Sequence, residues 1–304
     1  MFRVRKQVGC HEEVTEKYTG KNIVAAILDT GIMEHPDLRG RVIGFHDFIS
    51  AKAKPYDDCG HGTHVAGILA GNGMLSGGRY HGIAPNCKLV VGKVLNFNGD
   101  GNLGDMLAGM QWIHEVRDLY KIRILNISIG LNDLDDKESG KILIQEVERL
   151  WNDGIVVVAA AGNKGPSPMS ISPVGWSSKV ITVGCHDGGY FGDRPDICEN
   201  YSGRGPTDYA VKKPDIVAPG TDIVSCNVKC RRQYRGYKNA YTTKSGTSMA
   251  TPIVAGAAAL YLEKNPSATN EEVKRRMIYS ATDMNEPWTK QGWGMVNIGR
   301  LLNG

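Results

Sequence analysis

A serine stands where a glycine-containing turn runs into an apolar helix, within residues 245–252. The unpaired N–H groups and the dipole at the start of a helix favour negative charge, so an oxyanion formed beside Ser248 would be stabilised there. This arrangement suits acyl transfer. A serine in the same place is also common as a simple helix N-cap, and the segment alone does not separate the two interpretations.

Two other segments contain the groups that would activate such a serine. Residues 23–28 are all apolar and precede Asp29 and Gly31, which predicts a buried strand with a carboxylate at its carboxyl end. Ligand clefts of open α/β sheets lie outside the carboxyl ends of the strands, so Asp29 is where a catalytic group is expected. His61 lies between two glycines at the start of another helical run, where its imidazole could reach a neighbour.

A metal site is the alternative for the histidines. His61 and His64 are three residues apart, a spacing that can place two ligands on one helical face, with Asp58 as a third. The sequence contains no H-E-x-x-H motif, which disfavours this interpretation.

The three segments, in the order Asp29, His61, Ser248, resemble the signatures of the subtilisin-like serine proteases, or subtilases. Chymotrypsin-like and α/β-hydrolase triads have other chain orders, and no G-x-S-x-G motif occurs. The likeness runs from about residue 18 to the last helix. Further agreeing blocks are GIAP at 82–85, AAGN at 160–163, YSGRGP at 201–206 and KPDIVAPG at 213–220.

The resemblance implies a role for each of these residues. Ser248 would attack a peptide carbonyl, His61 would accept and return the proton, and Asp29 would orient the imidazolium. Asn163 would donate its side-chain N–H to the oxyanion, with the backbone N–H of Ser248 as second donor. Taken alone, Asn163 in Asn-Lys-Gly is typical of a turn.

Substrate recognition in the resembling family implies an extended peptide held between two enzyme segments by backbone hydrogen bonds, which favours broad specificity. The expected substrate-binding residues are Leu95, Gly99, Asp100 and Gly101 on one side, Ser128, Ile129 and Gly130 on the other, and Ala160, Ala161 and Gly162 in the primary pocket.

The elements that position these residues follow from the apolar pattern. Buried strands are expected at residues 23–28, 89–95, 122–129, 155–161 and 180–183, with helical stripes at 103–116 and 143–150 between them. The resemblance implies a three-layer α/β fold with a mostly parallel central sheet of about seven strands and helices on both faces. No linker interrupts the chain, so residues 1–304 are expected to form one peptidase domain.

No cofactor is expected to be required for the chemistry, but the resemblance makes structural calcium possible. Asp37 matches a family calcium ligand, although the loop at 71–80 that should add carbonyls departs in length and composition. Asp215 matches a cation ligand of some relatives. A capping or salt-bridged aspartate is the alternative for both residues.

Composition limits the partners. The formal net charge is +4, so no nucleic-acid partner is implied. Basic and aromatic residues alternate at 229–241, a pattern that can bind single-stranded nucleic acid, but a solvated loop is the favoured interpretation. No signal peptide or membrane span is recognisable, and the seven cysteines are an odd number, so a cytoplasmic protein with thiols is expected. Many subtilases carry a proregion. Asp29 lies too close to Met1 for one to fit, so the chain either folds unaided or has lost its proregion, and an intracellular-type enzyme is expected.

The sequence thus predicts a serine endopeptidase that acts on proteins or peptides through an acyl-enzyme. The alternatives are a subtilase-fold regulatory or binding protein with little turnover, and an esterase.

Overall fold

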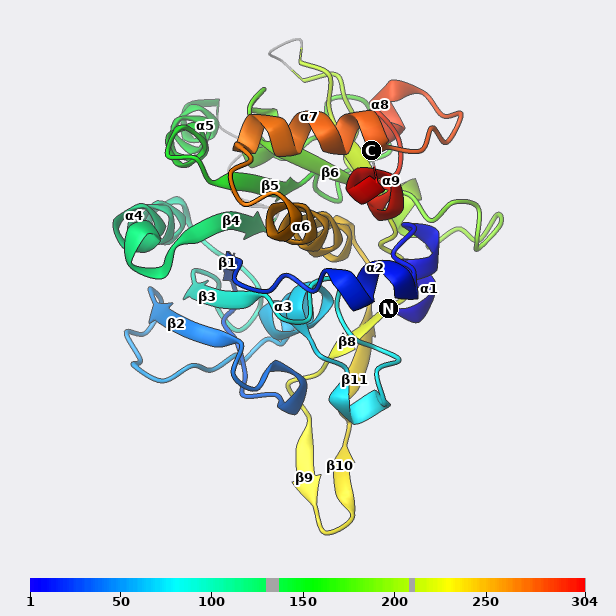
Figure 1. The fold of residues 1–304 in the computed structure, drawn as a ribbon. Coiled ribbons are helices and arrows are strands. Elements are labelled where there is room, and N and C mark those ends of the chain that lie inside the picture. Colours follow the sequence, from blue (N-terminus) through cyan, green and yellow to red (C-terminus); the bar gives the residue numbers. More distant parts are fainter. Residues whose placement is uncertain (130–136, 208–210, 304) are drawn as a thin grey trace.

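The apolar runs of the sequence form the centre of a seven-stranded sheet (Figure 1). The computed structural model describes residues 1–129, 137–207 and 211–303. The strand order is β2-β3-β1-β4-β5-β6-β7, and all six neighbouring pairs are parallel. The strands are β1 (Val24–Asp29), β2 (Val42–Asp47), β3 (Lys88–Lys93), β4 (Ile122–Ile127), β5 (Val156–Ala160), β6 (Ile181–Cys185) and β7 (Ile216–Ala218). This confirms the expected parallel α/β sheet.

The two edge strands were not predicted. In β2 only two of six residues are buried, and β7 is three residues long, so neither carries the continuous apolar run that marked the central strands. The strand expected at 122–129 ends at Ile127, and the next two residues leave the sheet at its carboxyl edge.

Helices cover both faces of the sheet. On one face, α4 (Leu103–Tyr120) and α5 (Lys137–Asn152) pack against each other and against the central strands. On the other, α3 (His61–Ala70) packs against α6 (Thr247–Lys264), and α7 (Asn270–Ser280) and α9 (Ile298–Asn303) pack beside α6. Shorter helices are α1 (Phe2–Gln7), α2 (Glu12–Lys17) and α8 (Trp288–Gln291), and the 3₁₀ helices are Pro36–Leu38, Met74–Ser76, Pro173–Trp176 and Cys198–Asn200.

A two-stranded antiparallel ribbon, β8 (Ile223–Cys226) with β11 (Tyr241–Lys244), packs on α3. The chain between these strands forms the hairpin β9 (Arg231–Gln233) and β10 (Gly236–Lys238), which extends away from the body (Figure 1). All six hairpin strand residues are exposed. The basic and aromatic segment is therefore a solvated hairpin.

The described helices include none that is both long and apolar enough to cross a membrane.

Candidate active site

Asp29 and His61 are in direct contact at the carboxyl end of β1. The Nδ1 atom of His61 lies 2.7 Å from Oδ1 of Asp29, which also accepts a hydrogen bond of 2.7 Å from the Thr30 N–H. Asp29 is completely buried, whereas 23% of the His61 side chain is exposed. Helix α3 can begin this close because its second residue is Gly62, where a Cβ would collide with the carbonyl oxygen of Gly31 and lie 3.2 Å from the Asp29 side chain.

The pKa of the His61 imidazole is raised above its ordinary value. Burial acts to lower it, but the negative charge of Asp29 and the hydrogen bond to it act the other way and prevail. The ammonium group of Lys244 opposes this increase. A neighbouring carboxylate therefore favours a proton on this histidine, as general-base catalysis requires.

Asp57 organises the loop that leads into α3. One carboxylate oxygen accepts hydrogen bonds from the N–H groups of Cys59 (3.1 Å) and Gly60 (2.7 Å) and from the Thr30 hydroxyl (2.8 Å). The other accepts from the N–H and the hydroxyl of Thr63, at 2.9 and 2.6 Å. Asp57 thus ties the end of β1 to the first turn of α3. Nothing in the sequence distinguishes it from its neighbour Asp58.

Lys93, at the end of β3, is a completely buried ammonium group beside the site. Its Nζ donates to the carbonyl oxygens of Thr30 (2.7 Å) and Leu95 (2.8 Å) and to Oδ1 of Asp58 (2.7 Å). Lys93 pairs in register with Asp29, and its ammonium group links the backbone that follows β1 to the backbone that follows β3. A buried lysine carries no signal in the sequence, and we did not predict it.

Ser248 lies in the first turn of α6 and is 9% exposed. Asn163 follows β5, and its amide oxygen accepts from the N–H (3.0 Å) and the hydroxyl (3.1 Å) of Thr247. These bonds turn the Asn163 NH₂ group away from Thr247. Because α3 packs against α6, the first turns that carry His61 and Ser248 belong to two helices in contact.

His64 plays a different part from His61. It is completely buried, and its Nε2 lies 3.0 and 3.2 Å from the carbonyl oxygens of Ile223 and Thr242 in the β8–β11 ribbon. Burial, with the nearby His61 and Lys244, lowers the pKa of His64 to about 3, so the ring is neutral and donates to these carbonyls. Since Asp58 binds Lys93 instead, the alternative metal group of His61, His64 and Asp58 does not form.

The expected substrate-binding residues follow β3, β4 and β5, on the carboxyl side of the sheet. Leu95 follows β3, and Gly99, Asp100 and Gly101 belong to a surface turn that the Asn96 side chain holds. Ser128 and Ile129 follow β4 and are buried, whereas Gly130 lies outside the described residues.

The remaining three, Ala160, Ala161 and Gly162, end β5 or follow it and are also buried. All three carbonyl groups accept hydrogen bonds: Ala160 from the Ser172 hydroxyl (2.9 Å), Ala161 from the Ser172 N–H (2.8 Å), and Gly162 from the Gly203 N–H (2.7 Å). These bonds make a rigid wall next to Asn163.

The two aspartates expected to bind calcium have other partners. Asp215 is buried between two ammonium groups, with Lys213 at 2.6 Å and Lys274 at 3.0 Å, and it accepts from the Thr182 N–H. These lysines lower the pKa of Asp215 against the effect of burial and already neutralise its charge, so it does not fit a cation ligand. Asp37 is buried beside a histidine and a cysteine. Calcium prefers six to eight oxygen ligands, so this environment does not suit calcium.

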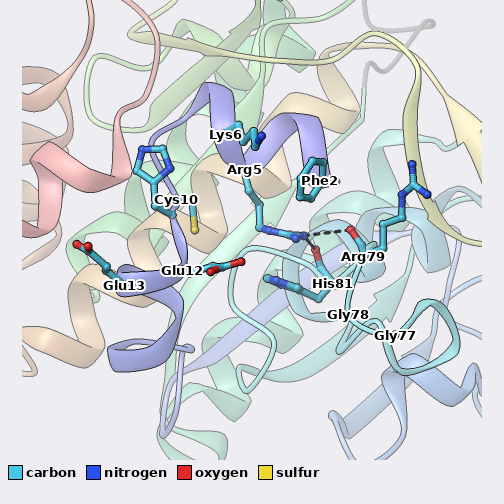
Figure 2. A pocket seen from close by; sticks show the side chains of 11 residues that line it. Phe2, Arg5, Lys6, Cys10, Glu12, Glu13, Gly77, Gly78, Arg79 and His81 are labelled. Atoms are coloured by element: carbon cyan, nitrogen blue, oxygen red, sulfur yellow. Dashed lines mark hydrogen bonds between the residues drawn. The ribbon is translucent and has the colours of Figure 1, made fainter.

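A cavity of about 860 Å³ lies elsewhere, between the N-terminal helices and residues 77–81 (Figure 2). Figure 2 shows the Arg5 guanidinium reaching the carbonyl oxygens of Arg79 and His81, and the latter hydrogen bond is 2.8 Å long. None of the residues that line it is an expected site residue.

The fold is that of the subtilisin-like proteinases. The structure of Sphericase matches with a TM-score of 0.78 and 27% identity, over 97% of both chains. A cold-adapted subtilisin-like serine proteinase matches with a TM-score of 0.67 and 28% identity, over 92% of this chain and 88% of the other.

A family model for the subtilases matches residues 20–294. Serine protease AprX of Bacillus subtilis is 44% identical over 94% of this chain and 67% of its own length. Subtilisin DY of Bacillus licheniformis is 34% identical over 92% of this chain and 91% of its own. The chain belongs to the subtilase family, and it is a serine endopeptidase.

Proposed function

We propose that Ser248, His61 and Asp29 form the catalytic triad of this endopeptidase. The observation that carries the proposal is the 2.7 Å contact between His61 and the buried Asp29, which orients the imidazole and raises its pKa. With Nδ1 donating to Asp29, Nε2 of His61 is the basic nitrogen that takes the Ser248 proton and later delivers it to the leaving amine. Asp29 remains a carboxylate and stabilises the imidazolium.

Asn163 is the proposed side-chain donor to the oxyanion. Its amide oxygen is held by Thr247, which leaves the NH₂ group as the part that can face a substrate beside Ser248. The N–H of Ser248, at the start of α6, is the second proposed donor.

The proposed specificity is broad. The segments at 99–101 and 128–130 would hold an extended peptide mainly through its backbone, which carries little sequence information. The buried residues 160–162 would form the wall of the primary pocket beside Asn163. No feature of the site favours a regulatory protein with little turnover.

The other proposals concern the whole molecule. Its apolar core includes residues from both ends of the sequence, and the Ile298 N–H donates to the Val8 carbonyl at 2.7 Å, which supports one peptidase domain over residues 1–304. All seven cysteines are free thiols, which supports a reducing, cytoplasmic location. Proteins or peptides are the proposed partners, and nucleic acid and membranes are not.

Hydrolysis of casein by the full chain tests the function, with Ser248→Ala as the inactive variant. Ser245→Ala is the matched control, because Ser245 lies three residues earlier and its hydroxyl accepts a hydrogen bond of 2.9 Å from the Asp222 N–H. We expect Ser245→Ala to retain activity and Ser248→Ala to lose it. Comparison of a peptide amide with the matched ester separates a protease from an esterase, because only a protease protonates an amine leaving group efficiently. Turnover of the ester alone would contradict the proposal.

A further inference from the structure

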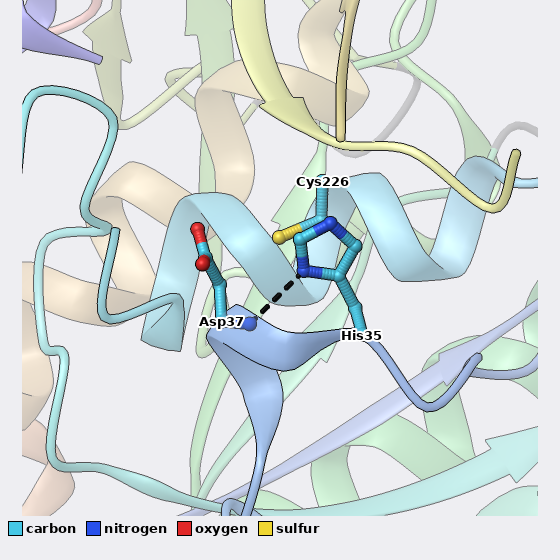
Figure 3. A group of neighbouring side chains, drawn as sticks. All are labelled: His35, Asp37 and Cys226. Carbon is cyan, nitrogen blue, oxygen red and sulfur yellow. Dashed lines mark hydrogen bonds between the residues drawn. The ribbon is translucent and has the colours of Figure 1, made fainter. Parts of the chain in front are cut away.

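His35, Asp37 and Cys226 bring one nitrogen, one oxygen and one sulfur atom to a common point. The three ligand atoms lie within 4.8 Å of one another, and all three residues are buried. Figure 3 shows the imidazole, the carboxylate and the thiol facing one another, from the segment after β1 and from the end of β8. These elements are far apart in sequence and distinct from the triad.

The hydrogen bonds around His35 leave its unprotonated nitrogen, Nδ1, facing the Asp37 carboxylate and the Cys226 thiol. Nε2 lies 2.8 Å from the Ala240 carbonyl oxygen and therefore carries the proton. Burial lowers the pKa of His35, so the ring is neutral and Nδ1 has a lone pair, which accepts a 3.1 Å hydrogen bond from the Asp37 N–H. A histidine that donates its other N–H to a backbone carbonyl is the usual arrangement of a metal ligand.

Asp37 is oriented in the same way. Its Oδ2 accepts from the Tyr241 hydroxyl at 2.6 Å, and its Oδ1 accepts from the Leu75 N–H at 3.0 Å. Each bond uses one lone pair of a carboxylate oxygen, so further lone pairs remain. Hydrogen-bonded carboxylates of this kind hold metals in a fixed direction.

This donor set does not fit calcium. Calcium takes oxygen ligands only, whereas imidazole and thiolate suit zinc. We propose that His35, Asp37 and Cys226 form a structural binding site for a thiophilic divalent ion, and that this ion is zinc, whose ligand preference matches these three side chains. Binding forms bonds from the metal to Nδ1, to a carboxylate oxygen and to Sγ, and it releases the Cys226 thiol proton to solvent. Burial disfavours that thiolate when no metal is bound.

The geometry requires only a small adjustment. Tetrahedral zinc with bonds of about 2.0 to 2.3 Å holds its ligands about 3.3 to 3.8 Å apart, so the three groups need to approach by at most about 1.5 Å. The metal replaces the Asp37 N–H as the partner of His35 Nδ1.

A further thiol and an entrance lie close by. Cys230 is four residues beyond Cys226, is 5% exposed, and is near enough to Asp37 for the carboxylate charge to add to the effect of burial in raising its pKa. Cys230 and His35 also line a cavity of about 530 Å³, through which an ion can enter.

The site would fasten the β8–β11 ribbon to the segment after β1. This ribbon also receives the hydrogen bonds of His64 from α3, and the Ser225 hydroxyl donates to the His64 carbonyl at 2.8 Å. A metal that binds only the folded chain raises the unfolding temperature in proportion to the logarithm of its concentration.

Equilibrium dialysis of the full chain against zinc ions tests the proposal. All samples carry the Ser248→Ala change, which prevents self-digestion. We expect one zinc per chain, a thiolate-to-metal charge-transfer band when cobalt replaces zinc, and a rise in unfolding temperature with zinc but not with calcium. Cys226→Ser should weaken zinc binding by more than about tenfold, since loss of outer-shell partners alone costs that much. The control Cys87→Ser, at another buried thiol, should bind as the parent does.

Two results would overturn the proposal. One is unchanged zinc affinity and cobalt absorption in Cys226→Ser. The other is the absence of a thiolate band in the parent chain at saturating cobalt, a measurement that decides the matter even if Cys226→Ser does not fold.

Discussion

Lys93 provides a sharp test of how the site is supported, because it is a buried cation held by three hydrogen bonds, and it also lies 5.0 Å from the centre of the Tyr56 ring. Its ammonium group is completely buried and donates three hydrogen bonds of 2.7 to 2.8 Å, to Thr30, Leu95 and Asp58. The change Lys93→Met keeps most of the stem volume and removes only the charge and the donors. Thr30 adjoins Asp29, and Leu95 begins the expected substrate segment, so both stability and activity should respond.

The size of the effect follows from the three partners. Hydrogen bonds to charged groups contribute about 1.5 to 3 kcal/mol each, and two of the acceptors are backbone carbonyls that the methionine leaves unpaired. Removing one partner of a buried ion pair costs about 3 to 5 kcal/mol in general. The Asp58 side chain is 42% exposed and can be hydrated again, so we expect the lower end, about 3 kcal/mol of unfolding free energy.

Urea unfolding of Lys93→Met in the Ser248→Ala background measures this loss. Lys88→Met is the matched control, because Lys88 lies on the same strand and its Nζ donates at the surface to the Gly40 carbonyl. That change should cost less than about 1 kcal/mol. Equal losses in the two variants, or a loss below about 1 kcal/mol for Lys93→Met, would refute the reasoning.

Three further predictions concern the site and its histidines. Asn163→Ala should lower kcat by about 10² to 10³-fold with little change in KM, a magnitude known from the matching asparagine of subtilisin, and a larger effect on KM in steady-state peptide assays would argue against an oxyanion donor. The pKa of His61 is raised above 6.5 and the base must be neutral, so kcat/KM should decrease as the pH drops through a value above 6.5. Asp29→Asn should move this acid limb of the pH profile to lower pH and reduce kcat by on the order of 10⁴-fold. An acid limb that does not move would count against the pairing of Asp29 with His61. His64 has a pKa of about 3 when folded and 6.5 when unfolded, so its stabilising contribution is complete above pH 6.5 and is lost as the pH falls toward 3, at up to about 1.4 kcal/mol per pH unit. Urea unfolding at pH 7 and pH 5 should show a smaller pH effect in His64→Asn than in the parent, and an equal effect would contradict a buried neutral ring.

The central strands and the Asp29–His61 contact could be predicted because they rest on local patterns. An uninterrupted apolar run that ends in an aspartate marks a buried parallel strand with a polar group at its carboxyl edge, as β1 has. The edge strands lack such a run. Neither the pattern nor the motif could indicate that Lys93 is buried, since that depends on three acceptors from different segments.

The environment of Asp37 shows a different limit. The family motif suggested a calcium ligand, but the identity of a metal site depends on every group around it, and Cys226 lies far along the chain from Asp37. Asp215 shows the same limit: Lys213 is two residues away in sequence, but Lys274 reaches it only through the packing of α7.

The most direct test of the central claim is reaction of the full chain with a fluorophosphonate, followed by peptide mass spectrometry to locate the label. Such a reagent forms a stable adduct with a serine only where a base removes the hydroxyl proton and donors stabilise the developing charge. The account predicts stoichiometric labelling of Ser248 that is lost in Ser248→Ala and strongly slowed in Asp29→Asn. Absence of labelling on Ser248, or labelling that is indifferent to Asp29, would contradict it.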